Sequence, residues 1–216
     1  MTATETTMSL ARDERRDFAA FLATLTPPQW GAPTLCTRWR VRDVVAHVYS
    51  YEELGFGRLA GRFLRTRFDT DRINAIGLAD FAAASDADLL ARARSCVQPR
   101  GLTAMMGGRI ALTDGLIHQQ DIRRSLGLPR EVPPARLVAA LDTARAAPTL
   151  KAAPRVRGLT LSAPELGWTA GEGPLVEGPG EAVLMAVAGR REATAELTGP
   201  GVAILDERCA RAPGPV

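Results

Sequence analysis

Several residue types are scarce in this sequence of 216 residues, and their scarcity excludes whole classes of protein. The three cysteines are odd in number and form no CxxC pair, which argues against a disulfide framework or a cysteine-built zinc site and favours a reducing, cytoplasmic location. No stretch approaches about 18 uninterrupted apolar residues, and no basic segment leads into an apolar one at the N-terminus. We therefore expect neither a membrane span nor a signal peptide.

Concentrated positive charge is also missing. The sequence has 27 basic and 24 acidic residues, so its net charge is only +3, and lysine occurs once, at Lys151. The arginines are scattered among acidic and apolar residues, whereas nucleic-acid-binding proteins usually gather basic residues on one element. A nucleic-acid partner is therefore disfavoured.

The hydrophobic content of 46% is sufficient for a core, and the length fits one large domain or two small ones.

Helical periodicity dominates the first 130 residues. Apolar residues recur at helical spacing in four segments. The first covers 9–25, the second starts near Arg40, the third runs from the N-cap Ser85 to Pro99, and the fourth runs from about 103 to 126. Proline closes the first and third segments, and Gly127 stands where the fourth needs a left-handed C-cap. Four helices with short or moderate connections favour a bundle.

After residue 130 the long helical periodicity gives way to shorter segments separated by glycine and proline. Two prolines open a helix that we expect to reach Ala147, so residues 131–150 are interpreted as a linking helix. Glycines and prolines then separate three β-like runs and one short helix, at 156–161, 166–169, 175–177 and 182–188. Residues 151–216 are therefore predicted to form a small α+β domain.

The two histidines, His47 and His118, each lie in an otherwise apolar helix. Asp114, His118 and Asp121 occupy positions i, i+4 and i+7, which places them on one helix face. Unpaired carboxylates in such surroundings would be costly, and a divalent cation bound by Asp114, His118 and His47 of a facing helix would compensate them. Two simpler interpretations stay open here: His47 as a hydrogen-bonded core residue, and Asp114 with His118 as a surface pair.

Three segments carry a resemblance to a known family. The stretch PTLCTRWRVRDVVAHV (33–48) resembles a pattern in which Trp precedes a Val-x-Asp-Val-x-x-His helix. The stretch TDGLIHQQDIRRSLG (113–127) resembles a second signature, an acidic residue four positions before a histidine and then Asp-Ile. Both are similar to the mycothiol-dependent maleylpyruvate isomerase family of DinB-like metalloenzymes. The segment LGWTAGEGPLVEGPGEAVLMAVAGR (166–190) resembles the sterol-carrier-like C-terminal domain of that family.

The resemblance implies a mostly α fold: a DinB-like metal-binding four-helix bundle over 1–130, the linking helix 131–150, and a small α+β sterol-carrier-like domain over 151–216. It further implies a divalent metal, expected to be zinc, held by His47, Asp114 and His118. Family members often have Glu where this sequence has Asp114, and Ser or Thr where it has Arg40.

The resemblance also implies an enzyme whose partners are a small-molecule substrate and mycothiol, the low-molecular-weight thiol of actinobacteria. The metal would stabilise the thiolate at neutral pH. Reversible thiolate addition to a cis-olefin such as maleylpyruvate would give an isomerase, and lasting attachment to an electrophile would give a mycothiol S-transferase. A dicarboxylate substrate predicts convergent arginines, whereas a neutral electrophile predicts an apolar pocket. A non-haem iron enzyme and a non-catalytic DinB-like binding module stay open as alternatives.

Three further residues have more than one possible role. Arg190, in a family-like Gly-Arg pair, could be a catalytic residue that binds a substrate carboxylate, or it could complement the dipole at a helix end. Asp121 is interpreted as a carboxylate that orients a metal-bound histidine rather than as a ligand. Cys36 has no third histidine to activate it, so we interpret it as a packing residue.

Overall fold

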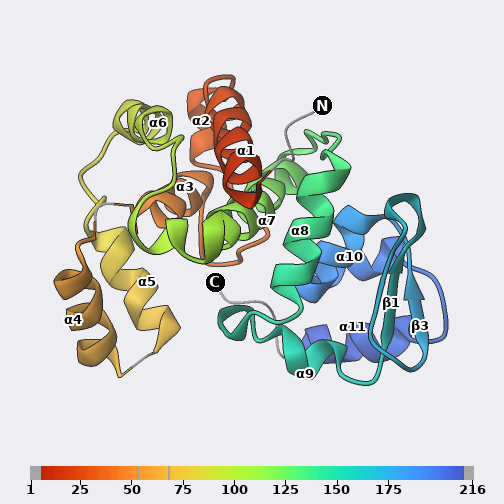
Figure 1. The fold of residues 1–216 in the computed structure, drawn as a ribbon. Coiled ribbons are helices and arrows are strands. Elements are labelled where there is room, and N and C mark those ends of the chain that lie inside the picture. Colours follow the sequence, from red (N-terminus) through yellow and green to blue (C-terminus); the bar gives the residue numbers. More distant parts are fainter. Residues whose placement is uncertain (1–5, 53, 68, 212–216) are drawn as a thin grey trace. The chain divides into compact units, whose positions relative to one another are not determined.

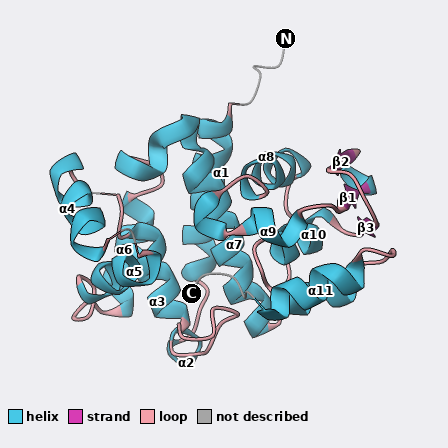
Figure 2. Ribbon diagram, turned by 90° about the horizontal axis from the view of Figure 1, so that it is seen from below, coloured by secondary structure: helices cyan, strands magenta, loops and turns pink. Residues whose placement is uncertain are grey.

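The structure, a computed structural model, describes residues 6–52, 54–67 and 69–211. It divides the chain into two compact units, one ending at Arg130 and one beginning at Glu131 (Figure 1). Both units are mainly helical, and the strands of the described ranges lie in the second (Figure 2). The mostly α fold with a small α+β C-terminal part is therefore confirmed. Within the described ranges, each helix is too short or too polar to cross a membrane.

The first unit is built around a ring of four helices. They are α1 (Thr7–Leu22), α3 (Val41–Tyr49), α6 (Asp86–Ser95) and α7 (Arg109–Leu126). Helix α1 contacts α6 and α7, and α3 contacts the same two helices, so each has two neighbours in the ring. Each contributes a fully buried apolar side chain to the core, namely Phe18, Val44, Leu89 and Ile122. This arrangement is the bundle that the sequence predicts.

Local signals fix the starts of two bundle helices. Ser85 caps α6: its hydroxyl accepts a hydrogen bond from the Asp88 amide, and the Asp88 carboxylate accepts one from the Ser85 amide. At α3 the Asp43 carboxylate accepts from the Arg40 amide at 2.9 Å, so it satisfies a donor at the helix N-terminus. The N-cap expected at Ser85 is thus present, and Asp43 stabilises the start of α3 in a similar way.

The prediction that the fourth helix starts near Thr103 was wrong. Residues 101–108 form the 3-10 segment η1 (Gly101–Gly108), and α7 starts at Arg109. Met106, Gly107 and Gly108 have φ values of 55°, 67° and 86°, which a right-handed helix cannot continue. A Cβ at Gly108 would lie 3.0 Å from the Met8 Cα, so the glycine also permits close packing against α1. The other end is as predicted, because Gly127 caps α7 in the left-handed conformation.

Three helices of the first unit were not predicted. They are α2 (Pro27–Trp30), α4 (Phe56–Thr66) and α5 (Thr70–Ala79). Helix α4 packs against α5, and α5 packs against α3 (Figure 1). Gly57 and Gly61 lower the helix propensity of α4, but Leu59, Phe63 and Leu64 recur at helical spacing, a signal that the sequence analysis did not use. The pair adds a further layer beside the bundle, over the helix that carries His47.

The second unit surrounds helix α10 (Gly180–Val187), of which seven residues are buried. Its other helices are α8 (Pro134–Ala144), α9 (Ala152–Val156) and α11 (Val202–Arg211), with short 3-10 turns η2 (Pro148–Leu150), η3 (Pro164–Leu166) and η4 (Arg191–Glu196). The strands β1 (Thr160–Ala163), β2 (Trp168–Ala170) and β3 (Leu175–Glu177) form a sheet in the order β2-β1-β3. Strand β1 is antiparallel to β2 and parallel to β3.

The strand predicted over 156–161 was partly wrong. Residue 156 ends α9, and the chain turns at Gly158, with φ 69°, before β1 begins at Thr160. The helix expected to reach Ala147 ends at Ala144 as α8, which belongs to the second unit, and α11 was not predicted. Strand β3 has the predicted bounds.

Candidate metal centre

The three predicted ligand residues meet between α3 and α7. The Nε2 atoms of His47 and His118 lie 3.7 and 3.5 Å from the same Asp114 oxygen, and the two imidazole rings are 4.9 Å apart. One ligand atom from each residue lies within 4.8 Å of the other two. Both histidines are buried, whereas the Asp114 side chain is 33% exposed, so the cluster has one side open to solvent. Two nitrogens and one oxygen with an open side suit a catalytic divalent metal.

The helices explain this convergence. Asp114 and His118 are one turn apart on α7, so their side chains project from the same face. His47 lies in the last turn of α3, and α3 packs directly on α7. Elements of both simpler interpretations are present, because His47 is a buried histidine and Asp114 with His118 is an i,i+4 pair, but the structure joins all three residues in one cluster.

Charge is balanced between these side chains by protonation. Burial lowers the pKa of His118, but the Asp114 carboxylate and the hydrogen bonds with Asp121 and Cys36 outweigh burial and raise this pKa to about 10. Burial raises the pKa of Asp114, but His118 and His47 outweigh it and hold this pKa below its ordinary value. A proton on His118 therefore compensates the carboxylate. A divalent cation at the three ligand atoms would provide the same compensation, so these residues fit a metal.

Asp121 lies against the other nitrogen of His118. Its Oδ2 is 2.9 Å from His118 Nδ1, and its side chain is fully buried. A carboxylate at Nδ1 favours the tautomer whose Nε2 lone pair points toward Asp114 and His47. This placement agrees with the orienting role expected for Asp121.

Cys36 is buried, as expected for a packing residue, but it also contacts the centre. Its thiol donates to Asp121 Oδ2 at 3.1 Å, and its Sγ lies 3.7 Å from His118 Nδ1. The sequence analysis missed this contact. The available signal was position: Cys36 is in the loop that leads directly into the helix carrying His47.

Two aromatic residues that the sequence analysis did not propose line the centre. The Trp39 ring lies 4.7 Å from the His47 ring and 6.1 Å from the His118 ring, and the Tyr51 ring is edge-on to His47 at 5.9 Å. The Tyr51 hydroxyl donates to Asn74 Oδ1 at 2.8 Å. Trp39 and Tyr51 thus connect His47 to α5.

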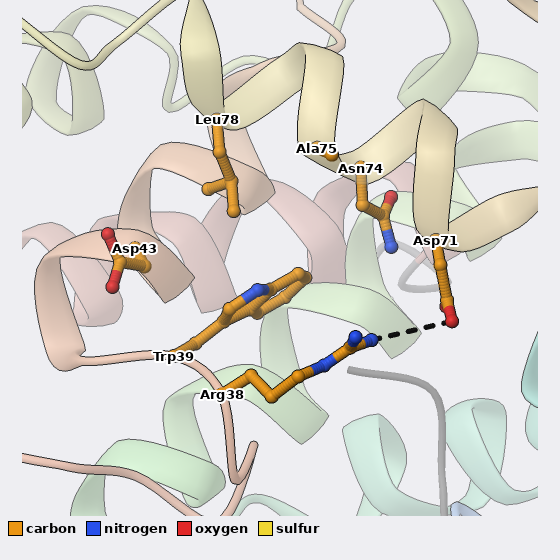
Figure 3. A pocket seen from close by; sticks show the side chains of 7 residues that line it. All are labelled: Arg38, Trp39, Asp43, Asp71, Asn74, Ala75 and Leu78. Atoms are coloured by element: carbon orange, nitrogen blue, oxygen red, sulfur yellow. Dashed lines mark hydrogen bonds and ion pairs between the residues drawn. The ribbon is translucent and has the colours of Figure 1, made fainter.

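A cavity of about 310 Å³ lies on the α5 side of Trp39. In Figure 3 the indole of Trp39 faces Leu78 and Asn74 of α5, and Arg38 reaches toward Asp71. The Arg38 guanidinium is 3.4 Å from the Asp71 carboxylate. The cavity is lined by Arg38, Trp39, Asp43, Asp71, Asn74, Ala75 and Leu78. Trp39 thus lines the cavity and also contacts both histidine rings, whereas the three candidate ligands are not among the lining residues.

Arg190 lies in the second unit, just beyond α10. Its side chain is buried, and its Nη1 donates to the carbonyl of Ala188, the C-cap of α10, at 2.9 Å. A guanidinium at this position complements the negative end of the helix dipole. This contact agrees with the helix-end role that the sequence analysis weighed against substrate binding, and substrate binding by Arg190 stays a prediction.

The chain is similar to one protein-family model and to solved structures of the same fold. Residues 11–100 match the family model described as mycothiol maleylpyruvate isomerase N-terminal domain. A crystal structure of a mycothiol-dependent maleylpyruvate isomerase is similar with a TM-score of 0.54 at 15% identity, covering 90% of this chain and 91% of that one. A histidine-to-alanine mutant of such an isomerase gives the same TM-score and coverage at 13% identity. No curated protein sequence matches this chain. At these identities the structures show a shared fold, and the family match supports the resemblance seen in the sequence.

Proposed function

We propose that this chain, whose residues 11–100 match the mycothiol maleylpyruvate isomerase family, is a divalent-metal-dependent enzyme that uses mycothiol to isomerise a small cis-olefin. The observation that carries the proposal is the convergence of His47 Nε2, His118 Nε2 and an Asp114 oxygen on one partly open point. Zinc suits two imidazole nitrogens and one carboxylate oxygen. The bound metal would stabilise the thiolate of mycothiol, which is the nucleophile for reversible addition to the olefin.

The chain's own residues would supply orientation and shielding. Asp121 holds His118 by its Nδ1, so that the Nε2 atom is directed toward the ligand cluster. Trp39 and Tyr51 cover the His47 ring and restrict water on that side. The cavity beside Trp39 is large enough for a small organic molecule, and we place the substrate there because Trp39 also contacts both histidine rings.

Thiol binding is the experiment that tests this proposal. Zinc-loaded protein should bind mycothiol and release the thiol proton, whereas metal-free protein should bind it poorly. Isothermal titration in buffers of different ionisation enthalpy counts the proton, because the observed heat then varies with the buffer. Maleylpyruvate incubated with the loaded protein and the thiol should give a product of unchanged mass. Fully metallated protein that does not bind the thiol would refute the proposal.

A mycothiol S-transferase is a second candidate, favoured by the charges of the cavity. Its lining contains one arginine, and Arg38 faces Asp71 while Asp43 adds a second carboxylate. Among the described lining residues, this is not the convergent positive charge that a dicarboxylate would require. A neutral electrophile fits such a lining better. Mass spectrometry separates the two reactions, because a transferase leaves the thiol attached to the product.

A further inference from the structure

The loop that leads into α3 contacts both histidines of the candidate centre. Within this loop the Trp39 ring packs against His47, and the Cys36 thiol reaches Asp121, which in turn bonds His118. One short segment of chain therefore supports one histidine directly and the other through a hydrogen-bonded chain.

We propose that Cys36 is a positioning residue for metal binding: its thiol holds the Asp121 carboxylate against His118 Nδ1 without itself being a ligand. This inference rests on the metal site of the proposed function and adds a residue to it. The thiol and the imidazole share one acceptor, since Sγ lies 3.1 Å and Nδ1 2.9 Å from the same Asp121 oxygen.

Burial makes the thiol contact important. The Asp121 side chain is fully buried, and Cys36 is 3% exposed, so bulk water cannot replace a donor lost from this carboxylate. A buried carboxylate held by fewer donors is costly and is free to turn away from its partner. If Asp121 turned, His118 would lose the contact that fixes its ring and tautomer, and its Nε2 would no longer be held toward the other two ligand atoms.

The loop backbone holds the thiol in place. The Cys36 amide donates to the Thr34 hydroxyl at 3.1 Å, and the Trp39 amide donates to the Cys36 carbonyl at 2.7 Å. The Leu35 amide donates to the backbone carbonyl of Asp121 at 3.3 Å. The loop is thus fixed to the same residue that its thiol contacts, so the hydrogen bond is preorganised.

A different arrangement would make Cys36 a metal ligand. Its Sγ, an Asp121 oxygen and a His118 nitrogen also lie within 4.8 Å of one another. We favour the positioning role because all three of these residues are buried, whereas the cluster containing Asp114 is open on one side. A catalytic metal needs such an opening for exchangeable ligands.

The test measures zinc affinity of the full chain without added thiol, by competition with a chromophoric chelator. Cys36→Ala should raise the zinc dissociation constant about 10-fold, as is typical when an outer partner of a metal-bound histidine is lost. Cys36→Val fills the space of the thiol with a slightly larger apolar side chain that has no donor. It should weaken zinc binding in the same way, and it replaces the alanine variant if that variant does not fold. Cys36→Ser keeps a donor and should stay within about 3-fold of the wild type. Cys96→Ala is the matched control, because Cys96 is a buried cysteine of the same core, and it should leave the affinity unchanged.

Three results would overturn this role. Equal zinc affinity in the wild type and in both donor-free variants would show that the thiol does not position Asp121. An intense thiolate-to-cobalt absorption band in the cobalt-substituted wild type, lost in Cys36→Ala, would make Cys36 a ligand instead. A wild type that binds no zinc would overturn this inference and the proposed function together, whereas the first result leaves the proposed function standing and the second moves its metal to the cluster of Cys36, His118 and Asp121.

Discussion

Raising the pH should destabilise the metal-free protein through His118. The imidazole has an ordinary pKa of 6.5 in the unfolded chain, and in the fold this pKa rises to about 10, because Asp114 and Asp121 outweigh the effect of burial. A group whose pKa is raised by folding stabilises the fold fully below its unfolded pKa and loses that contribution as the pH rises through its folded pKa. The loss should therefore extend from about pH 6.5 to about pH 10.

The pH dependence of the free energy of unfolding follows from the difference in bound protons between the folded and the unfolded chain. Within this window the folded chain holds one proton on His118 that the unfolded chain has released, so the free energy of unfolding should fall by up to about 1.4 kcal/mol per pH unit. A metal that takes the place of the proton should remove this slope. By the same linkage, zinc affinity should rise by up to about tenfold per pH unit in the window.

Urea unfolding with a chelator present, followed by circular dichroism at several pH values between about 6 and 9.5, measures the slope. The control is His118→Gln, which cannot titrate, so other groups contribute equally to both proteins. The wild type should lose stability with pH more steeply than the variant. Parallel profiles for the two proteins would refute the assignment of this proton to His118.

The remaining predictions concern individual side chains. Protein purified without chelator should contain about one divalent ion per chain by elemental analysis, and His47→Ala and His118→Ala should lose it; equal metal contents would contradict the site. Asp114→Asn should weaken zinc binding by more than the about 10–100-fold typical of outer partners, and Asp121→Asn should weaken it less; the reverse order would make Asp121 the ligand. Arg190→Ala is expected to raise KM for a dicarboxylate substrate and not for a neutral electrophile; unchanged kinetics would contradict substrate binding and favour the helix-end role, in which Arg190 donates to the Ala188 carbonyl.

Features that depend on neighbours along the chain could be predicted from the sequence. The cap at Ser85 and the left-handed end at Gly127 are present because each involves residues within one or two helical turns. The Asp114–His118 pair is of the same kind, since spacing on one helix decides that both side chains share a face. His47 of a facing helix was proposed to complete the set of ligands, and the family resemblance implied the same three residues.

Local signals failed where packing decided the outcome. The pattern predicts that α7 begins near Thr103, but residues 106–108 turn into the left-handed region, and the small size of Gly108 lets the chain pack against Met8. Helix α4 was missed for another reason, because Leu59, Phe63 and Leu64 do recur at helical spacing, although two glycines lower the helix propensity of the segment. It packs against α5, and contacts of this kind are not encoded by periodicity.

The candidate site divides in the same way. The sequence alone determined which residue types could bind a metal and placed Asp114 and His118 one turn apart. Only the tertiary structure brought the Nε2 atom of His47 to 3.7 Å from Asp114 and the thiol of Cys36 to 3.1 Å from Asp121. Cys36 and Asp121 are 85 positions apart in the chain, and such a contact depends on how the loop before α3 packs against α7. No local propensity specifies that packing, because it is set by burial of the shared core and by hydrogen bonds between distant segments.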